Sequence, residues 1–230
     1  MVLLTRRRLL LLLAVFVSFA GVALYALYSA SQHVPEFYAE AFEIPPTVAE
    51  KACDQFSDQA VALANDAEKE GVWNAVFSDD HINGWLATDL VTKHPKLLPP
   101  GFAHPRVKLS EDHAQIGVRY TVSGVETVAW IDLEARMTET HEISLTFRDV
   151  RAGAVPIPLA SILDAITRAA ADLEVPLRWA GGEERPTAII GLPQDSAKGL
   201  RHELTKLKLG DGQLYVSGRT FKSPPATETQ

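Results

Sequence analysis

Residues 113–137, HAQIGVRYTVSGVETVAWIDLEARM, alternate apolar and polar side chains over most of their length. Alternation places every second side chain on one face of an extended strand, so this stretch predicts two long strands joined by a short turn. The apolar set consists of Ala114, Ile116, Val118, Tyr120, Val122, Ala129, Ile131, Leu133, Ala135 and Met137. The predicted hairpin therefore belongs to an antiparallel sheet with one apolar face.

The same period of two continues on both sides of the hairpin. It includes Val107 and Leu109 before the hairpin, and Ile143, Leu145 and Phe147 after it. Runs joined in sequence by short polar turns predict an antiparallel meander, and strands of about ten residues favour a strongly twisted, curved sheet. Asp211-Gly212, between two further alternating runs, predicts another hairpin near the C-terminus.

Two other segments have the period of a helix. Residues 47–67 place apolar and mostly alanine side chains on one face, and Gly71 supplies the stop. Pro156 and Pro158 open a second amphipathic stretch that runs to Leu173. The sequence therefore predicts an α+β fold in which a long, curved antiparallel sheet packs on amphipathic helices.

An unbroken apolar run, LLLLLAVFVSFAGVALYALYSA at residues 9–30, directly follows Arg6, Arg7 and Arg8. As a helix it would be about 33 Å long, which is enough to cross a hydrocarbon core of about 30 Å. The arginines resist translocation, so we expect a single-pass anchor in the inner (cytoplasmic) membrane, with a cytoplasmic N-terminus and an extracytoplasmic, periplasmic body. A cleaved secretory signal and a twin-arginine signal are the alternatives.

These features divide the chain into four predicted parts. They are a cytoplasmic tip and transmembrane signal-anchor at 1–30, a proline-containing spacer at 31–46, an extracytoplasmic α+β domain at 47–222, and a disordered tail at 223–230.

The charge of the predicted exported part limits its partners. The only basic residues before position 31 are the three arginines, and no acidic residue precedes Glu36. Subtracting the arginines from the 22 Lys and Arg leaves 19 basic residues against 29 acidic ones, a net charge of −10. So acidic a body disfavours nucleic acid as a partner. Cys53 is the single cysteine, which excludes an intrachain disulfide.

Catalytic and metal-binding motifs were sought without success. The pairs His141-Glu142 and His202-Glu203 begin like the zinc-protease motif, but neither is followed by the required second histidine. The chain has no Gly-x-Ser-x-Gly elbow and no phosphate-binding loop. We therefore expect neither an enzyme nor a metal or cofactor site.

Polar candidates concentrate in FSDDHINGWL, residues 77–86. Ser78 is expected to cap a helix whose first turn carries two acids. The amide of Asn83 is expected to satisfy backbone groups at a helix–sheet junction, with ligand contact as the alternative, and Gly84 beside it allows close backbone approach. Trp130 falls on the polar face of its strand, where an exposed aromatic ring would mark a contact surface.

The FSDDHINGWL motif resembles the membrane-anchored YpmS-like proteins and, more distantly, LmeA-type and other tubular (TULIP-like) lipid-binding proteins. The matching residues are Ser78, Asp79, Asp80, Ile82 and Asn83, followed by the strands from Val107, the loop at 154–158 and the closing GDGQLYVSGRT. The resemblance implies a curved sheet wrapped around a helix, with an apolar groove for lipid. It brings no catalytic residues with it.

Two functions of different classes follow from these patterns. The first is the binding of a lipid or other apolar ligand along the apolar face of the sheet, and its candidate contacts are Trp85, Leu86, Ile131, Leu133, Ile143, Leu145 and Phe147. The second is a non-enzymatic scaffold that holds other envelope proteins and has a filled core. A hydrolase would require a polar cluster that the sequence does not display.

Overall fold

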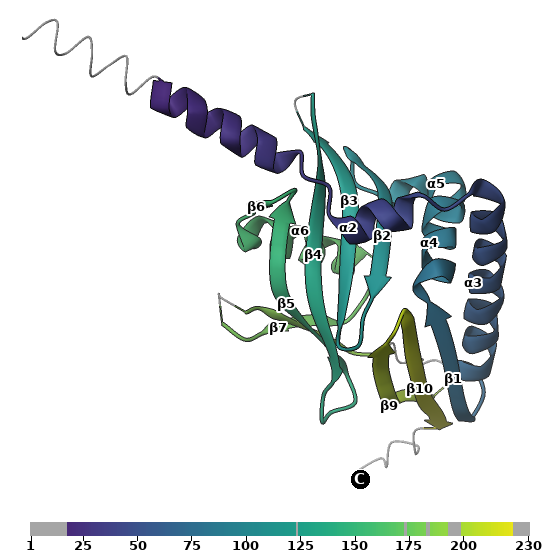
Figure 1. Cartoon of the computed structure of the whole chain (residues 1–230). Coiled ribbons are helices and arrows are strands. Elements are labelled where there is room, and N and C mark those ends of the chain that lie inside the picture. The colour runs from purple at the N-terminus through teal and green to yellow at the C-terminus, as the bar shows by residue number, and fades with distance from the viewer. Residues whose placement is uncertain (1–17, 123, 173, 183–184, 193–198, 223–230) are drawn as a thin grey trace, which may run out of the picture.

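The computed structural model describes residues 18–122, 124–172, 174–182, 185–192 and 199–222 (Figure 1). It is an α+β structure with two antiparallel sheets. The small sheet has the order β1 (Gly71–Ser78), β10 (Gln213–Lys222), β9 (Leu200–Gly210). The large sheet has the order β2 (Phe102–Leu109), β3 (His113–Val122), β4 (Val125–Met137), β5 (Ile143–Ala152), β8 (Thr187–Ile190), β7 (Leu177–Ala180), and β6 (Val155–Pro156) also pairs with β5.

The predicted meander is confirmed in strands β2 to β5. Each of these strands pairs antiparallel with the next in sequence, and Ile116 lies opposite Ile131 at the centre of the predicted hairpin. Register shifts interrupt the pairing of β2 between Ala103 and Arg106, and that of β4 with β5 beside Leu133. Such irregularities bend a strand and increase its local twist.

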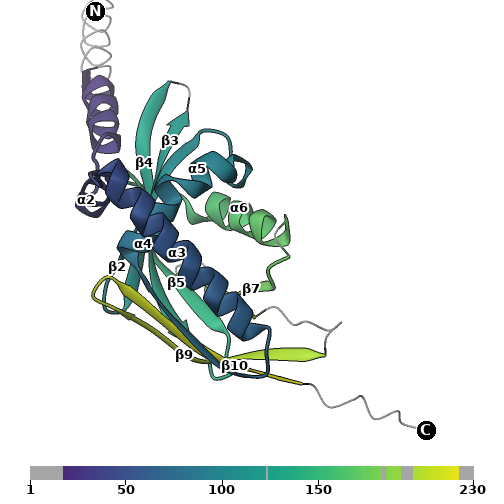
Figure 2. The ribbon, with the colours of Figure 1, turned by 90° about the vertical axis from the view of Figure 1, so that its right-hand side faces the viewer.

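The helices of the body are α2 (Glu36–Phe42), α3 (Pro46–Ala67), α4 (Asp79–Ala87), α5 (Asp89–Lys93), the short 3-10 helix η1 (Pro95–Leu97) and α6 (Leu159–Asp172), and a further helix at residues 18–31 precedes them. In Figure 2, α2 and α6 lie on opposite sides of the large sheet, while α3 crosses the small sheet. The two helices predicted from periodicity correspond to α3 and α6.

Apolar side chains pack on both faces of the large sheet, which corrects the expectation of a single apolar face. On one face, α6 packs over a core formed by Leu133, Phe147, Val150 and Ala188. On the other face, Phe37 and Tyr38 of α2 pack with Val128 and Trp130. Helix α2 can approach the sheet because β3 has glycine at position 117, where a Cβ would lie 2.6 Å from the Tyr38 ring.

The segment 31–46 is part of the folded body, so its prediction as a spacer is wrong. It contains α2, in which Tyr38 is only 2% exposed and donates a hydrogen bond from its hydroxyl to the backbone oxygen of His104 (2.7 Å). Seven residues between prolines give too short a periodic signal for a helix to be recognised from sequence. The predicted tail at 223–230 lies outside the described residues.

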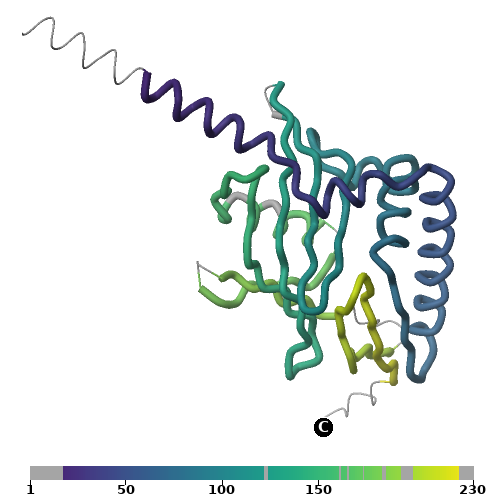
Figure 3. Tube along the Cα trace, viewed as in Figure 1, coloured from purple at the N-terminus to yellow at the C-terminus, as the bar shows by residue number. Residues whose placement is uncertain are grey.

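Residues 18–31 form a helix that projects from the body (Figure 3). Its large apolar side chains are exposed, with Phe19 at 74% and Tyr25 at 72%. Across the described residues, no helix combines the length and apolar character needed to cross a membrane. Residues 9–17 of the predicted span lie outside the described residues.

The C-terminal end of this helix is fixed to the large sheet. The Ala154 N–H donates to the Ala30 carbonyl (2.9 Å), and the Thr127 hydroxyl donates to the Ser31 carbonyl (2.6 Å). Gly153, with φ +57°, permits this contact because a Cβ there would lie 2.5 Å from the Ser31 oxygen. These bonds satisfy carbonyl groups that a helix end otherwise leaves unpaired.

Candidate functional site

The structure does not bring the predicted ligand-contact residues together into one open surface. Leu133 (6% exposed) and Phe147 (4% exposed) belong to the apolar cluster beside α6, and the half-buried Ile131 and Leu145 pack against that cluster. Ile143 is half-buried and lies opposite Ile190 of β8. Leu133 and Phe147 are therefore buried within the chain, and ligand contact by the half-buried residues Ile131, Ile143 and Leu145 stays a prediction.

Trp85 and Leu86 lie elsewhere, on α4, and both are half-buried. The Trp85 ring packs against Phe56 of α3 with the ring centroids 5.6 Å apart, and Phe56 in turn packs against Phe77 of β1 at 5.4 Å. Trp85 is therefore part of an aromatic contact between α3, α4 and the small sheet.

Trp130 is half-buried beneath α2, so the predicted contact surface is taken up within the chain. Its ring meets Phe37 edge-on with the centroids 6.2 Å apart, and its indole N–H donates to the Gly153 carbonyl (2.8 Å). The strand alternation that places Trp130 opposite the α6 face is correct. The sequence pattern did not predict α2, the helix that covers Trp130.

Ser78 and Asn83 hold structural positions at the junction of α4 with the large sheet. The Ser78 hydroxyl accepts from the His81 N–H (3.1 Å) and so caps α4. Asn83, 2% exposed, accepts from the Val107 N–H and donates to the Val107 carbonyl, both at 2.8 Å. Its amide thus satisfies the outer edge of β2, as the favoured interpretation of the sequence required.

An apolar pocket lies between α3 and the small sheet, at a place the sequence analysis did not identify. Its volume is about 340 Å³, and its lining consists of Ala60, Leu63, Ala64, Ala67, Trp73, Phe77, Leu192, His202 and Val216. The alternation of β1 points Trp73 and Phe77 to the same face, and Val216 lies on that face of the neighbouring strand β10.

Small side chains on α3 explain why this hollow exists. The N-terminal half of α3 packs tightly, with Ala49, Ala52 and Cys53 buried. Farther along the helix, Ala64 is exposed and Ala60 and Ala67 are only half-buried. Alanine is too short to fill the space above Trp73 and Phe77, so that space stays open.

The floor of the apolar pocket is fixed in place. Trp73 lies directly over Gly218 of β10, where any Cβ would collide with the indole ring. The indole N–H donates to the Thr220 hydroxyl (3.1 Å), and this hydroxyl donates to the Ala67 carbonyl (2.8 Å) at the end of α3. A buried tryptophan whose N–H is bonded presents a preorganised apolar ring to the pocket.

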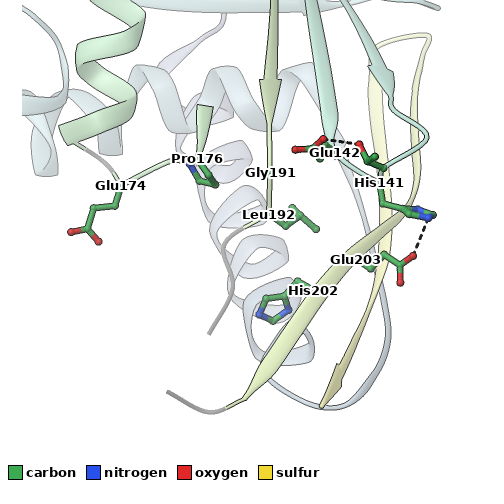
Figure 4. A pocket seen from close by; sticks show the side chains of 9 residues that line it. His141, Glu142, Glu174, Pro176, Gly191, Leu192, His202 and Glu203 are labelled. Atoms are coloured by element: carbon green, nitrogen blue, oxygen red, sulfur yellow. Dashed lines mark hydrogen bonds and ion pairs between the residues drawn. The ribbon is translucent and has the colours of Figure 1, made fainter. Parts of the chain in front are cut away.

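A second, polar pocket adjoins the first (Figure 4). It has a volume of about 620 Å³ and is lined by Thr140, His141, Glu142, Glu174, Pro176, Gly191, Leu192, His202 and Glu203. Leu192 and His202 line both pockets. The two hollows are therefore neighbours across these two side chains.

Carboxylate groups dominate the polar pocket. Glu142 receives hydrogen bonds from the Thr140 hydroxyl (2.6 Å) and the Arg178 guanidinium (2.5 Å), which lower the pKa of Glu142 below its usual value. Glu203 forms ion pairs with Arg219 (2.6 Å) and with Nε2 of His141 (3.0 Å). Arg178 and Arg219 thus approach these acids without being among the lining residues.

The arrangement shows no catalytic constellation. His141 places Nδ1 2.8 Å from the Leu204 carbonyl and Nε2 3.0 Å from a Glu203 oxygen, so neither ring nitrogen faces a nucleophile. In the described part of the chain, no group of three or more His, Cys, Asp or Glu side chains is arranged to hold a metal ion.

Outside the pockets, Asp132 on the α2 face of β4 is an acidic residue in a partly buried environment. Its Oδ1 is buried and has no hydrogen-bond partner among the described residues, and burial raises the pKa of its carboxyl. A raised pKa means that the folded state favours the protonated acid, so stability is lost as the pH rises from about 4, the unfolded-state value, through the folded-state pKa.

Asp132→Asn is expected to raise the free energy of unfolding by about 1 kcal/mol at pH 7, because the amide removes a partly buried charge whose Oδ1 atom has no hydrogen-bond partner among the described residues. The gain is expected to vanish near pH 3.5 in denaturant titrations at the two pH values. The control is Asp149→Asn, since Asp149 accepts from the Val150 N–H (2.9 Å) and Arg151 (2.7 Å) and its replacement should destabilise. An equal gain in the free energy of unfolding at both pH values would contradict the raised pKa of Asp132.

Comparisons of this chain with protein-family models, curated proteins and solved structures find no match. The resemblance to YpmS-like and LmeA-type proteins therefore stays a hypothesis, and the function has to be argued from the pockets themselves.

Proposed function

We propose that this chain is a single-pass membrane-anchored extracytoplasmic protein that holds an acyl chain of a lipid in the apolar pocket under α3. The pocket supports this proposal most directly. Its volume of about 340 Å³ falls in the range of about 300–1,000 Å³ that is usual for ligand sites. Two aromatic rings, one leucine on α3 and one valine on β10 offer apolar contact to a hydrocarbon chain.

The position of the pocket supports a tethered carrier. The helix at 18–31 leaves one end of the body, and the small sheet with the C-terminal half of α3 lies at the opposite end (Figures 1 and 2). If residues 9–30 span the membrane, the fixed end of the helix holds the pocket away from the bilayer surface. Such a protein would hold a lipid chain outside the membrane to which it is anchored.

The alternative function, an envelope scaffold, is favoured by a different observation. The sheet residues Leu133 and Phe147 are buried in an apolar cluster beside α6, as the core of a scaffold would be, although the aromatic residue expected at its contact surface is covered by α2. The pocket under α3 has no evident purpose in a scaffold, so we rank lipid binding first.

Acyl binding is tested by photolabelling the full-length chain in membranes that have been washed with alkaline carbonate. Two probes that share one diazirine- and alkyne-bearing acyl chain are used, a fatty acid and a monoacylglycerol. We expect at least one probe to label peptides that contain residues 60–67 or Trp73 and Phe77. Loss of the chain into the carbonate wash would contradict the anchor, and labelling confined to residues 18–31 would contradict the pocket.

Ala64→Phe is expected to reduce labelling in the pocket about tenfold, because its ring takes the place of about two buried methylene groups worth about 0.8 kcal/mol each. Ala64 is exposed at the pocket, so a larger side chain there need not disturb packing. The control is Ala62→Phe, which adds the same ring at an exposed α3 position that does not line the pocket. Equal labelling of the two variants would argue against acyl binding at this site.

A further inference from the structure

The two pockets together have the polarity of an amphiphile. The apolar pocket is lined almost entirely by hydrocarbon side chains, and the polar pocket begins at the same Leu192 and His202. A molecule whose chain fills the first hollow would therefore place its headgroup in the second. This step rests on the proposed function, because it takes an acyl chain as the occupant of the apolar pocket.

The lining of the polar pocket determines which headgroups fit. Three carboxylates, those of Glu142, Glu174 and Glu203, line it, while Arg178 and Arg219 do not. The two nearby arginines are already engaged, since Arg178 pairs with Glu142 and Arg219 pairs with Glu203, and the His141 ring also contacts Glu203. The lining therefore offers a ligand mainly carboxylate oxygen atoms, which accept hydrogen bonds.

Among the residues that the structure describes, an anionic headgroup would meet these carboxylates, and both nearby arginines are already paired with two of them. Like charges at a few ångströms repel even at the high dielectric of a solvated pocket. Hydroxyl or amine hydrogens, by contrast, would find carboxylate acceptors, and hydrogen bonds to a charged acceptor are the stronger kind. The predicted exported part as a whole is acidic, so its wider field acts in the same direction.

We propose that the polar pocket selects amphiphiles whose headgroup donates hydrogen bonds and carries no net negative charge. A monoacylglycerol belongs to this class, and a fatty acid with the same chain does not. The polar pocket thus determines the chemical class of the ligand's headgroup, whereas the apolar pocket determines only that the ligand has an acyl chain.

The test compares the two photolabelling probes on the full-length chain in nanodiscs of dioleoyl phosphatidylcholine at pH 8, each at the same mole fraction in the lipid. We expect the monoacylglycerol probe to label the pocket peptides about tenfold more than the fatty acid probe, as repulsion by carboxylates predicts. The double variant Glu142→Gln/Glu174→Gln should reduce this preference at least to near equality, because Arg178 then loses its carboxylate partner. The control is Glu50→Gln, which removes an exposed charge from α3 outside the polar pocket and should leave the preference unchanged.

The outcomes separate this inference from the proposed function. If neither probe reaches the pocket peptides, the proposed function fails. If both probes label equally, or if the fatty acid labels more strongly, the acyl site stands and the headgroup selection is overturned. A preference that survives in the double variant would also overturn it, since the carboxylates would then not be its cause.

Discussion

Replacing Asn83 with leucine is expected to lower the free energy of unfolding by about 3 kcal/mol, because both the N–H and the carbonyl of Val107 then lose their partner at a buried site. Asn83 is 2% exposed, so water cannot take over either bond without the local structure opening. The measurement is denaturant unfolding of the full-length chain in nonionic detergent, followed by tryptophan fluorescence. Hydrogen exchange at Val107 should also rise more than at amides far from β2.

Two variants sharpen this test. Asn83→Asp keeps an acceptor for the Val107 N–H but sets a carboxylate against the Val107 carbonyl, so it should also destabilise. Asn74→Leu makes the same exchange at an exposed position of β1 and should change stability by no more than about 0.5 kcal/mol. If Asn83→Leu unfolded at the same denaturant concentration as the wild type, the hydrogen bonds between Asn83 and Val107 would contribute little to stability.

The spacing of the residues in this motif explains its geometry. Asp79 and Asn83 are four residues apart on α4, a rise of about 6 Å, and Leu109 and Val107 are two residues apart on β2, a rise of about 6.6 Å. The near match lets Asp79 accept from the Leu109 N–H (3.3 Å) while Asn83 bonds to Val107. A helix thereby covers an edge strand that would otherwise present unpaired backbone groups.

The turn between β9 and β10 is joined to the same junction. The Asp79 N–H donates to the Gly212 carbonyl (2.8 Å), and the Gly212 N–H donates to the Leu109 carbonyl (3.1 Å). The Asp211-Gly212 signal predicted the turn, but not that it would lie beside β2, because that contact depends on how the two sheets meet. Helix caps and hairpins are local features, and the packing of one sheet against another is not.

Strand alternation correctly predicted which face of the sheet each side chain occupies. It did not predict which helix packs on each face. It placed Leu133 and Phe147 on one face and Trp130 on the other, as the structure has them. It could not show that α6 packs on the first face and that α2 packs on the second. Those outcomes depend on a short helix and on Gly117, where the absence of a side chain makes room.

The pocket under α3 could not be predicted for a related reason. Alanine at positions 60, 64 and 67 fits two opposite outcomes, close packing of the helix or an unfilled space beneath it. The first half of α3 takes the former course, with Ala52 buried, and the second half takes the latter. The sequence signal that was available is the pair Trp73 and Phe77, two large rings on one face of β1, together with the alanines of the second half of α3.

The close approach of α3 and α4 leads to the other large expected effect. A Cβ at Gly84 would lie 2.6 Å from the Ala52 Cβ, 2.7 Å from the Cys53 nitrogen and 2.8 Å from the Ala49 oxygen. Two of these three atoms are backbone, so a side chain there must push the helices apart. Gly84→Val is therefore expected to destabilise the protein by about 3 kcal/mol, at the upper end of overpacking costs.

The single cysteine reports this change directly, because Cys53 is 4% exposed and lies on the α3 turn that Gly84 contacts. Thiol labelling in native buffer should be about a hundredfold faster in Gly84→Val, since labelling follows the opening equilibrium and 1.4 kcal/mol corresponds to a factor of ten. The control is Gly210→Val, at a glycine with no atom within 4 Å of an added Cβ. Equal labelling rates of Cys53 in Gly84→Val and in the control would contradict the prediction. The helices α3 and α4 would then accommodate the valine by moving apart at little cost, and α3 would not be the rigid wall that an acyl pocket requires.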